Sequence, residues 1–241
     1  MIKSPRLVAG VLVALMTLTV LNTAGMMTFT VLSTTGIFTI APTAPQTLAA
    51  APESPQTLTV ATPQHKIVCI GDSITRTWPE ILQQHLGPAW TVIDKGKGGD
   101  STYGMLVRFD TDVIANHPQF VVICAGTAAM GHGEGTQQIE SNIAKMCDLA
   151  AANGIKPVLC TIPPREDNNG VYMPSVNDVN AWVKIYAAAK GYSVIDFYAL
   201  LNDPAHPGHY LTQYSAGDGV HPNAQGYQAM GNYVPLTVFG R

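Results

Sequence analysis

The sequence predicts an α/β protein, organised as a three-layer α/β/α sandwich around a sheet of five parallel strands. From residue 66 onward, short runs rich in Val and Ile alternate with amphipathic stretches. The short runs lack the strict alternation of a half-exposed strand, which indicates burial on both faces. Such a sheet needs helices on both sides, joined by right-handed crossovers.

Five runs have the length and composition of strands, and they cover residues 66–70, 90–94, 120–125, 156–161 and 193–197. Helices are expected between or after them at residues 78–86, 106–116, 136–153, 176–190 and 224–233. Local signals support two of these ends. Pro79 suits a first helical turn, and Asn153 followed by Gly154 suits a helix stop before the fourth strand.

The amino terminus has the order of a secretory signal, since Lys3 and Arg6 precede an apolar run over residues 7–21. Uncharged, Thr-rich sequence continues to residue 40, so two outcomes remain open. Cleavage after a small residue such as Ala24 or within 49–51 is favoured over an uncleaved anchor that spans a bilayer. Residues 41–64 contain five prolines and predict an extended linker. We therefore expect a signal peptide or anchor at 1–40, a linker at 41–64 and a folded domain at 65–241, in a secreted or extracytoplasmic protein.

Composition excludes several classes of protein. The 241 residues are 46% hydrophobic and 12% charged with a net charge of -3, which disfavours both a disordered chain and a basic nucleic-acid reader. The four cysteines lie in apolar or helical patterns without a CxxC pair, so we expect core residues rather than a zinc site. No metal, cofactor or nucleic-acid partner is expected, and membrane contact is expected only if residues 7–40 remain as an anchor.

Small and nucleophilic residues follow the predicted strands, at the edge where parallel sheets bind ligands. Gly71-Asp72-Ser73 follows the first run, residues 98–101 the second and 126–129 the third. Ser73 lies between a strand and a helix, so its hydroxyl can stand at the sheet edge near amides that face a developing negative charge. An isolated Gly-Asp-Ser is also a common helix cap, and the tripeptide alone does not separate the two interpretations.

A serine nucleophile needs a base, and His221 is the strongest candidate among the seven histidines. Asp218 precedes it by three residues with Gly219 between them, so a tight loop would let the carboxylate orient the imidazole. The alternative is that Asp218 only begins a turn toward Pro222. His132 lies in a Gly-rich turn on the same edge and is a candidate for lining the pocket.

Together these segments resemble the SGNH hydrolases, also called GDSL esterases and lipases, over residues 66–235. The resemblance implies that Ser73 is the nucleophile, that His221 is the general base and then acid, and that Asp218 orients His221. It also implies that the amides of Ser73 and Gly99 form part of the oxyanion hole. The implied fold is the flavodoxin-like sandwich with strand order 2-1-3-4-5.

One residue of the family pattern is replaced. The third block of the family reads Gly-x-Asn-Asp, whereas this chain has Gly126-Thr127-Ala128-Ala129, and a methyl group cannot supply the oxyanion donor of the Asn. Loss of one such donor costs about 100- to 1,000-fold in turnover. The sequence therefore predicts a weakened enzyme rather than an inert one, with Thr127, His132 or a bound water as alternative donors.

The expected function is hydrolysis of short-chain acyl esters through an acyl-enzyme, with O-acetylated carbohydrate as a candidate substrate. Loops on the active edge are rich in Gly, Pro, Asn and His, contain tyrosines and include no long apolar lid. Substrate contacts are predicted for Asp72, Thr127, His132 and Tyr172, and the alternative for the tyrosines is that they only pack the loops. The alternatives are a lysophospholipase or thioesterase-type lipase, and a non-catalytic carbohydrate-binding protein on the same fold.

Overall fold

The computed structural model describes residues 16–22, 25–31 and 65–240. Strands β1 (Met16–Asn22) and β2 (Gly25–Val31) form an antiparallel hairpin in which Met16 pairs with Val31 and Asn22 with Gly25. The hairpin falls within the predicted signal or anchor, while the rest of residues 1–64 lies outside the described residues. Among the described residues, no helix has both the length and the apolar character needed to cross a membrane.

The predicted sheet is confirmed. Its strands are β3 (His65–Gly71), β4 (Trp90–Gly96), β5 (Phe120–Cys124), β6 (Lys156–Cys160) and β7 (Ser193–Ile195). All pairings are parallel, in the order β4-β3-β5-β6-β7, which is the expected order 2-1-3-4-5. Strand β3 therefore lies inside the sheet with β4 and β5 on its two sides, and the β3 exit is close to the β5 exit.

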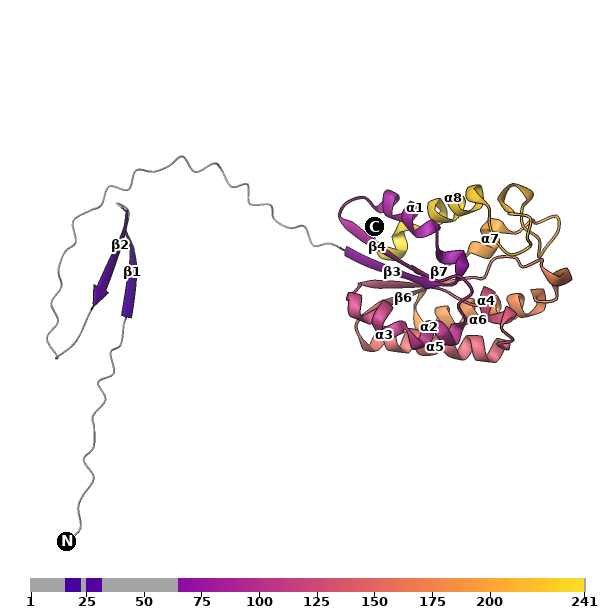
Figure 1. Ribbon diagram of the computed structural model, residues 1–241, viewed down its shortest axis with the longest axis horizontal. Coiled ribbons are helices and arrows are strands. Elements are labelled where there is room, and N and C mark those ends of the chain that lie inside the picture. The colour runs from indigo at the N-terminus through magenta and orange to yellow at the C-terminus, as the bar shows by residue number, and fades with distance from the viewer. Residues whose placement is uncertain (1–15, 23–24, 32–64, 241) are drawn as a thin grey trace, which may run out of the picture. The chain divides into compact units, whose positions relative to one another are not determined.

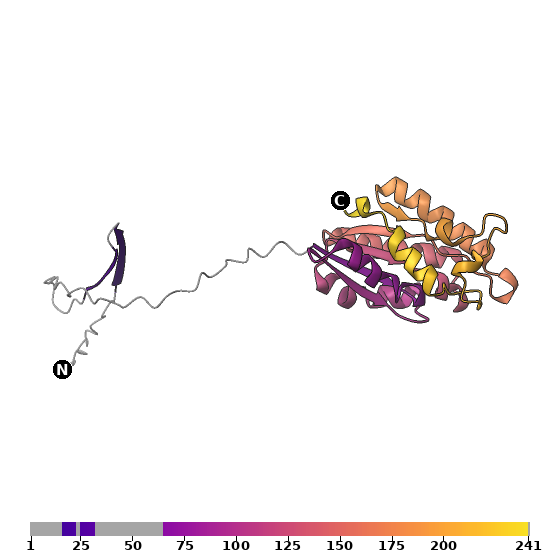
Figure 2. The same ribbon diagram turned by 90° about the horizontal axis from the view of Figure 1, so that it is seen from above.

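Helices cover both faces of this sheet, as Figures 1 and 2 show. One face packs against α1 (Trp78–Leu86), α7 (Phe197–Leu201) and α8 (Ala224–Tyr233). The other packs against α2 (Thr102–Val107), α3 (Phe109–Asp112), α5 (Thr136–Ala152) and α6 (Met173–Lys190). Successive β3 residues enter opposite cores, with Ile67 and Cys69 on the first face and Val68 and Ile70 on the second. Burial on both faces explains why this strand lacks polar alternation.

The prediction of a single helix over residues 106–116 was wrong. The chain instead forms α2, α3 and a 3-10 turn at Ile114–Asn116, with a bend at Arg108 (φ -95°, ψ 6°) and another at Val113 (φ -113°, ψ -64°). Met105, Phe109 and Val113 have the four-residue spacing of one helical face, and all three are fully buried. The Arg108 guanidinium pairs with Asp100 at the first bend. The helical period thus indicated the buried face, whereas the bends coincide with a tertiary ion pair that the period does not indicate.

The remaining expected helices are confirmed with small shifts at their ends. Helix α8 has the predicted bounds, α5 ends one residue earlier, and α6 begins at Met173 with Pro174 in its first turn. The short helices α4 (Thr127–Gly131) and α7 were not predicted. The four cysteines are free and buried, which confirms their place in the core.

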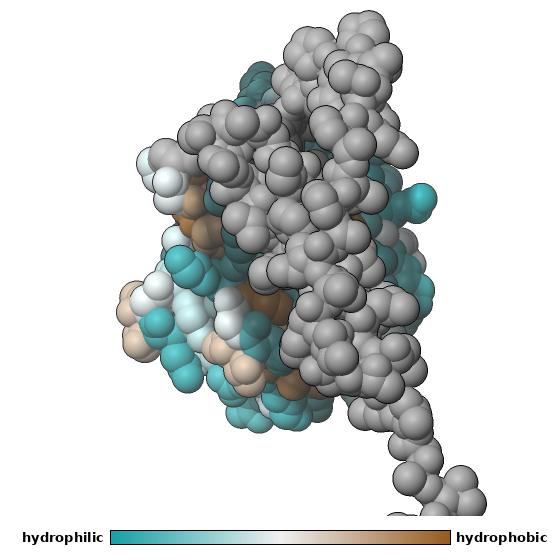
Figure 3. Space-filling view, turned by 90° about the vertical axis from the view of Figure 1, so that its left-hand side faces the viewer, coloured by the Kyte–Doolittle hydropathy of each residue, from teal (hydrophilic) through white to brown (hydrophobic). Residues whose placement is uncertain are grey.

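The two ends of the sheet differ in character. A cavity of about 440 Å³ lies at the end where the strands begin and is lined by the first residues of three strands, Phe120, Lys156 and Ser193. Figure 3 views the molecule from the side on which β3 begins, and its visible coloured part mixes hydrophilic and hydrophobic residues. The serine, aspartate and histidine singled out above lie at the opposite end, beyond the last residues of the strands.

Candidate active site

The candidate nucleophile stands on a tight turn after β3. Ser73 begins a 3-10 turn, Ser73–Thr75, and Asp72 caps it by accepting a hydrogen bond from the Ile74 amide at 3.0 Å. A Cβ atom at Gly71 would lie 1.9 Å from Thr75 Oγ1 and 2.4 Å from the Cys124 carbonyl oxygen, so only glycine fits there. The close approach of β5 to this turn places the Ser73 hydroxyl at the carboxyl edge of the sheet.

Ser73, His221 and Asp218 form a continuous hydrogen-bonded chain. Ser73 Oγ lies 2.8 Å from His221 Nε2, and His221 Nδ1 lies 2.7 Å from Asp218 Oδ2. Because a carboxylate only accepts, Nδ1 carries the proton and Nε2 is left as an acceptor for the serine hydroxyl. The three side chains therefore have the geometry of a nucleophile, its base and an orienting carboxylate.

Asp218 also folds the loop that carries the histidine. Its Oδ1 accepts hydrogen bonds from the amides of Val220 (2.9 Å) and His221 (2.8 Å). Burial alone would raise the pKa of this carboxyl, but these two amides and the His221 imidazole more than offset it, and the pKa lies below its ordinary value. Asp218 is thus ionised at neutral pH and can stabilise a protonated His221.

Two contacts that the sequence did not predict hold this loop from outside. Tyr210 donates its hydroxyl to the Val220 carbonyl at 2.8 Å, and the amide of Glu166 donates to the Gly219 carbonyl at 2.6 Å. Gly219 has φ +75°, and a Cβ atom there would lie 2.7 Å from the Asp167 nitrogen. Periodicity does not indicate these contacts, because both lie between irregular loops and the Glu166 contact spans more than fifty residues.

Two backbone amides that follow β3 and β4 have no protein acceptor in the described part of the chain. Within the described residues, neither the Ser73 amide nor the Gly99 amide donates to a protein acceptor, so both are free to bind an oxyanion. Gly99 has φ +69° and its carbonyl oxygen lies 2.8 Å from His132 Nε2. A carbonyl only accepts, so His132 donates this bond and fixes the orientation of the Gly99 turn. His132 is therefore beside the candidate oxyanion hole, at the edge where it was expected.

Ala128 lies at the start of α4, and its amide is already engaged. It donates to Asp72 Oδ2 at 3.0 Å. Asp72 is 1% exposed, and burial raises its pKa against the opposing effect of the Ala128 and Ile74 amides. Both carboxylate oxygens of Asp72 thus bind backbone amides of the protein itself, which joins the turn after β5 to the turn that carries Ser73.

The other two predicted substrate contacts lie around Arg165. The buried Arg165 guanidinium donates to the Thr127 carbonyl, pairs with Asp167 at 2.7 Å and lies 3.9 Å from the centre of the Tyr172 ring. Thr127 is 5% exposed. Tyr172 thus contacts the Arg165 side chain within the loop between β6 and α6, and its contact with a substrate stays a prediction. Among the described residues, no three His, Cys, Asp or Glu side chains are grouped so as to hold a metal ion.

Comparison with known proteins agrees with this geometry. The family model of the GDSL-like lipase/acylhydrolase family matches residues 69–229, a range that includes the three side chains of the hydrogen-bonded chain. The protein belongs to this family. A GDSL-like lipase from Bacteroides thetaiotaomicron VPI-5482 is 28% identical with a TM-score of 0.64, covering 73% of this chain and 88% of its own. A member of the lipolytic G-D-S-L family from Veillonella parvula DSM 2008 is 26% identical with a TM-score of 0.64, covering 73% and 99%.

A curated relative matches a shorter region of this GDSL protein. The uncharacterized lipoprotein YqeF of Bacillus subtilis (strain 168) is 28% identical over 123 residues, which is 43% of this chain and 51% of the relative. The match thus spans about half the length of that relative. The family and the solved structures confirm the SGNH resemblance and the fold, and they support a carboxylic ester hydrolase.

Proposed function

We propose that this protein is a serine ester hydrolase that acts through an acyl-enzyme on short-chain acyl esters and lacks one donor of the usual oxyanion hole. The hydrogen-bonded chain from Ser73 through His221 to Asp218 is the observation that supports this proposal most strongly. It is adjacent to two unengaged backbone amides, at Ser73 and Gly99, so the nucleophile and the electrophilic site lie side by side.

In the proposed reaction, Ser73 Oγ attacks the ester carbonyl carbon while His221 Nε2 takes its proton. The carbonyl oxygen becomes an oxyanion, which the amides of Ser73 and Gly99 stabilise. His221 then gives the proton to the alcohol oxygen as the C–O bond breaks. Water next attacks the acyl-enzyme with His221 again as base, which releases the acid and restores the Ser73 hydroxyl.

The surroundings of the site favour a small acyl group on a polar alcohol. The cavity next to the His221 loop is lined by charged and polar side chains, whereas the larger cavity of about 440 Å³ lies at the other end of the sheet. A long acyl chain needs an apolar cavity at the reacting carbon. O-acetylated carbohydrate therefore remains the leading substrate class. An extracytoplasmic location follows from the predicted signal segment and fits a relative whose name is that of a lipoprotein.

Covalent labelling of the full chain tests the nucleophile. An alkyl fluorophosphonate should form one Oγ–P bond at Ser73 with loss of fluoride, seen as a single mass increase that peptide mapping assigns to this residue. Ser73→Ala should remain unlabelled. Ser101→Ala is the matched control, because Ser101 lies on the same edge but accepts a bond from the Gly104 amide as a helix cap, and this variant should still be labelled.

Hydrolysis of p-nitrophenyl acetate, butyrate and octanoate tests the acyl preference. We expect the acetate and butyrate to be turned over faster than the octanoate, and all three activities to depend on Ser73. A folded protein that neither labels at Ser73 nor hydrolyses any of these esters would contradict the proposal.

A further inference from the structure

A second cavity, of about 270 Å³, lies beside the candidate active site. Its lining residues come from the β6–α6 loop and from the segment between α7 and α8, and they are Glu166, Asp203, His206, His209, Tyr210 and Thr212. Two imidazole–carboxylate pairs are formed here. His206 Nδ1 lies 2.9 Å from Asp203 Oδ2, and His209 Nδ1 lies 3.1 Å from Glu166 Oε2.

These pairs determine which hydrogen-bonding groups the cavity presents to a ligand. Because each Nδ1 donates to a carboxylate, the Nε2 atom of each neutral imidazole is an acceptor, and neither Nε2 has a partner among the described side chains. The two imidazoles are 73% and 60% exposed. Thr212 adds a hydroxyl on the same wall. Hydroxyl groups of a ligand can donate to these acceptors and accept from Thr212.

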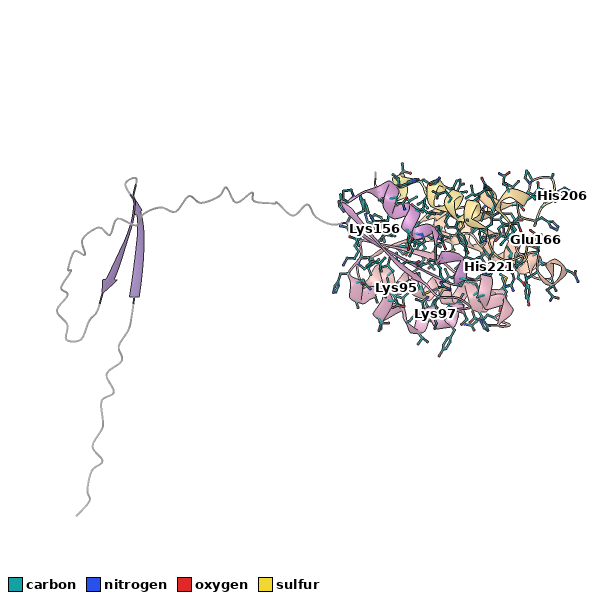
Figure 4. All side chains as sticks on the ribbon, turned by 45° about the horizontal axis from the view of Figure 1, so that its top comes forward. Lys95, Lys97, Lys156, Glu166, His206 and His221 are labelled. Atoms are coloured by element: carbon teal, nitrogen blue, oxygen red, sulfur yellow. The ribbon has the colours of Figure 1, made fainter. Side chains whose placement is uncertain are left out.

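The cavity is joined to the loop that carries the base. Glu166 lines it and donates its amide to the Gly219 carbonyl at 2.6 Å, while Tyr210 lines it and donates its hydroxyl to the Val220 carbonyl at 2.8 Å. Figure 4 shows His206, Glu166 and His221 toward the same end of the domain, with Lys156 toward the other. The cavity thus lies next to the loop of Asp218 and His221.

The proton transfers of ester cleavage indicate which part of the substrate lies near this cavity. His221 must reach the alcohol oxygen to protonate it, so the leaving alcohol lies on the His221 side of the reacting carbon. The carbonyl oxygen points the other way, toward the amides of Ser73 and Gly99. An alcohol that extends beyond His221 therefore reaches the cavity rather than the His132 side.

We propose that this cavity is the subsite for the leaving alcohol and that the alcohol is an uncharged carbohydrate, an inference that rests on the proposed esterase function. Two carboxylates line the subsite, and Asp203 is held ionised because the His206 imidazole and the Ala205 amide lower its pKa. These two carboxylates, from Asp203 and Glu166, disfavour a phosphate group in the cavity. The subsite therefore disfavours lysophospholipids and the phosphate-bearing thiols of thioester substrates.

The test compares two acetate esters on the full chain. A methyl glycoside carrying one acetyl group presents aliphatic hydroxyls to the subsite, whereas p-nitrophenyl acetate has the same acyl group and none. In His209→Ala, and independently in Asp203→Asn, we expect the ratio of kcat/KM for the glycoside to that for p-nitrophenyl acetate to fall at least tenfold, mainly through KM. His85→Ala is the control, because His85 is exposed at the end of α1, and its ratio should match the wild type.

The outcomes separate the two proposals. A ratio that is unchanged in both variants, with Ser73-dependent hydrolysis of p-nitrophenyl acetate intact, would overturn the subsite and leave the esterase function standing. Faster hydrolysis of an acetylated glycerophosphate than of the acetylated glycoside would also overturn the subsite. If a folded protein showed no Ser73-dependent hydrolysis of either acetate ester, both proposals would fail.

Discussion

The two sides of Ser73 are built to different degrees of completeness. On the side of the candidate base, His221, every expected contact is present. Ser73 Oγ lies 2.8 Å from His221 Nε2, and His221 Nδ1 lies 2.7 Å from Asp218 Oδ2. On the acceptor side two amides are free, but the third position is Ala128, which has no side-chain donor and whose amide is engaged by Asp72. In the proposed mechanism, activation of Ser73 and binding of the oxyanion are thus assigned to separate segments that can vary independently.

The acceptor side keeps its backbone frame despite the alanine. Asp72 joins the Ala128 amide to the serine turn, and His132 holds the Gly99 carbonyl. Neither contact depends on the side chain at position 128. The proposed deficit is therefore one missing donor and not a misfolded oxyanion hole, and variants on each side of Ser73 separate the two.

The largest effect is expected on the base side. Ser73→Ala removes the nucleophile and should lower kcat for p-nitrophenyl acetate by about 10,000-fold or more. Circular dichroism should show an unchanged fold, since Ser73 is only half-buried and begins a short turn. Activity within tenfold of the wild type would show that Ser73 is not the nucleophile.

Asp218→Asn should lower kcat about 100- to 1,000-fold, less than for a buried triad carboxylate because the Asp218 side chain is 51% exposed. The folded-state pKa of Asp218 is depressed, so its ionised contribution is present above the ordinary pKa of 3.8 and is lost only as the pH falls through the folded value. Because the carboxylate also stabilises the protonated form of His221, wild type and variant are compared at about pH 8, where the base is available in both and we expect the full loss. A variant within tenfold of the wild type at that pH would contradict the role of the carboxylate.

Gly219→Ala should disturb the support of the base loop. The added Cβ would lie 2.7 Å from the Asp167 nitrogen at φ +75°, so we expect about 2 to 3 kcal/mol of lost stability in urea unfolding together with reduced kcat. Gly217→Ala is the matched control. Its φ is +84° but its Cβ would meet nothing within 4 Å, so it should cost only about 1 kcal/mol. Equal losses of unfolding free energy in the two variants would show that close packing at Gly219 is not the cause.

The smallest effect is expected for His132, a positioning residue on the acceptor side. His132→Ala should lower kcat about tenfold with little change in KM, since the Gly99 turn loses the bond to its carbonyl. His132→Gln, whose side-chain amide can donate the same bond, should recover part of the loss. A change confined to KM would instead assign His132 to substrate binding.

The sequence predicted those features that have a local signal. Such signals mark the buried strands, the Gly-Asp-Ser turn and the close spacing of Asp218 and His221. The pattern of buried strands is what predicts the fold. The structure adds what depends on tertiary contact. Glu166 supports the loop of Asp218 and His221 across a long separation in the sequence, Tyr210 supports the same loop from a neighbouring irregular segment, and Arg108 pairs with Asp100 at a bend that periodicity could not indicate.

Some functional expectations changed for the same reason. Asp72 and Tyr172 lie in the segments where substrate contacts were expected, but their partners are protein groups, the Ala128 amide and the Arg165 guanidinium. Asp72 has a partner in a distant segment and Tyr172 has one within its own loop, and neither contact is visible in the composition of a loop. Position in the sequence was therefore sufficient to bring Ser73, His221 and Asp218 together, and insufficient to indicate the protein partners of Asp72 and Tyr172.

Measuring kcat for Ala128→Asn on p-nitrophenyl acetate tests the central claim most directly, with Ala128→Leu as a control of similar side-chain shape that lacks a donor. If the acceptor side limits turnover because one donor is missing, the Asn variant should be at least tenfold faster than the wild type and the Leu variant should not. An Asn variant that folds but is no faster, or a Leu variant that gains as much, would contradict the account.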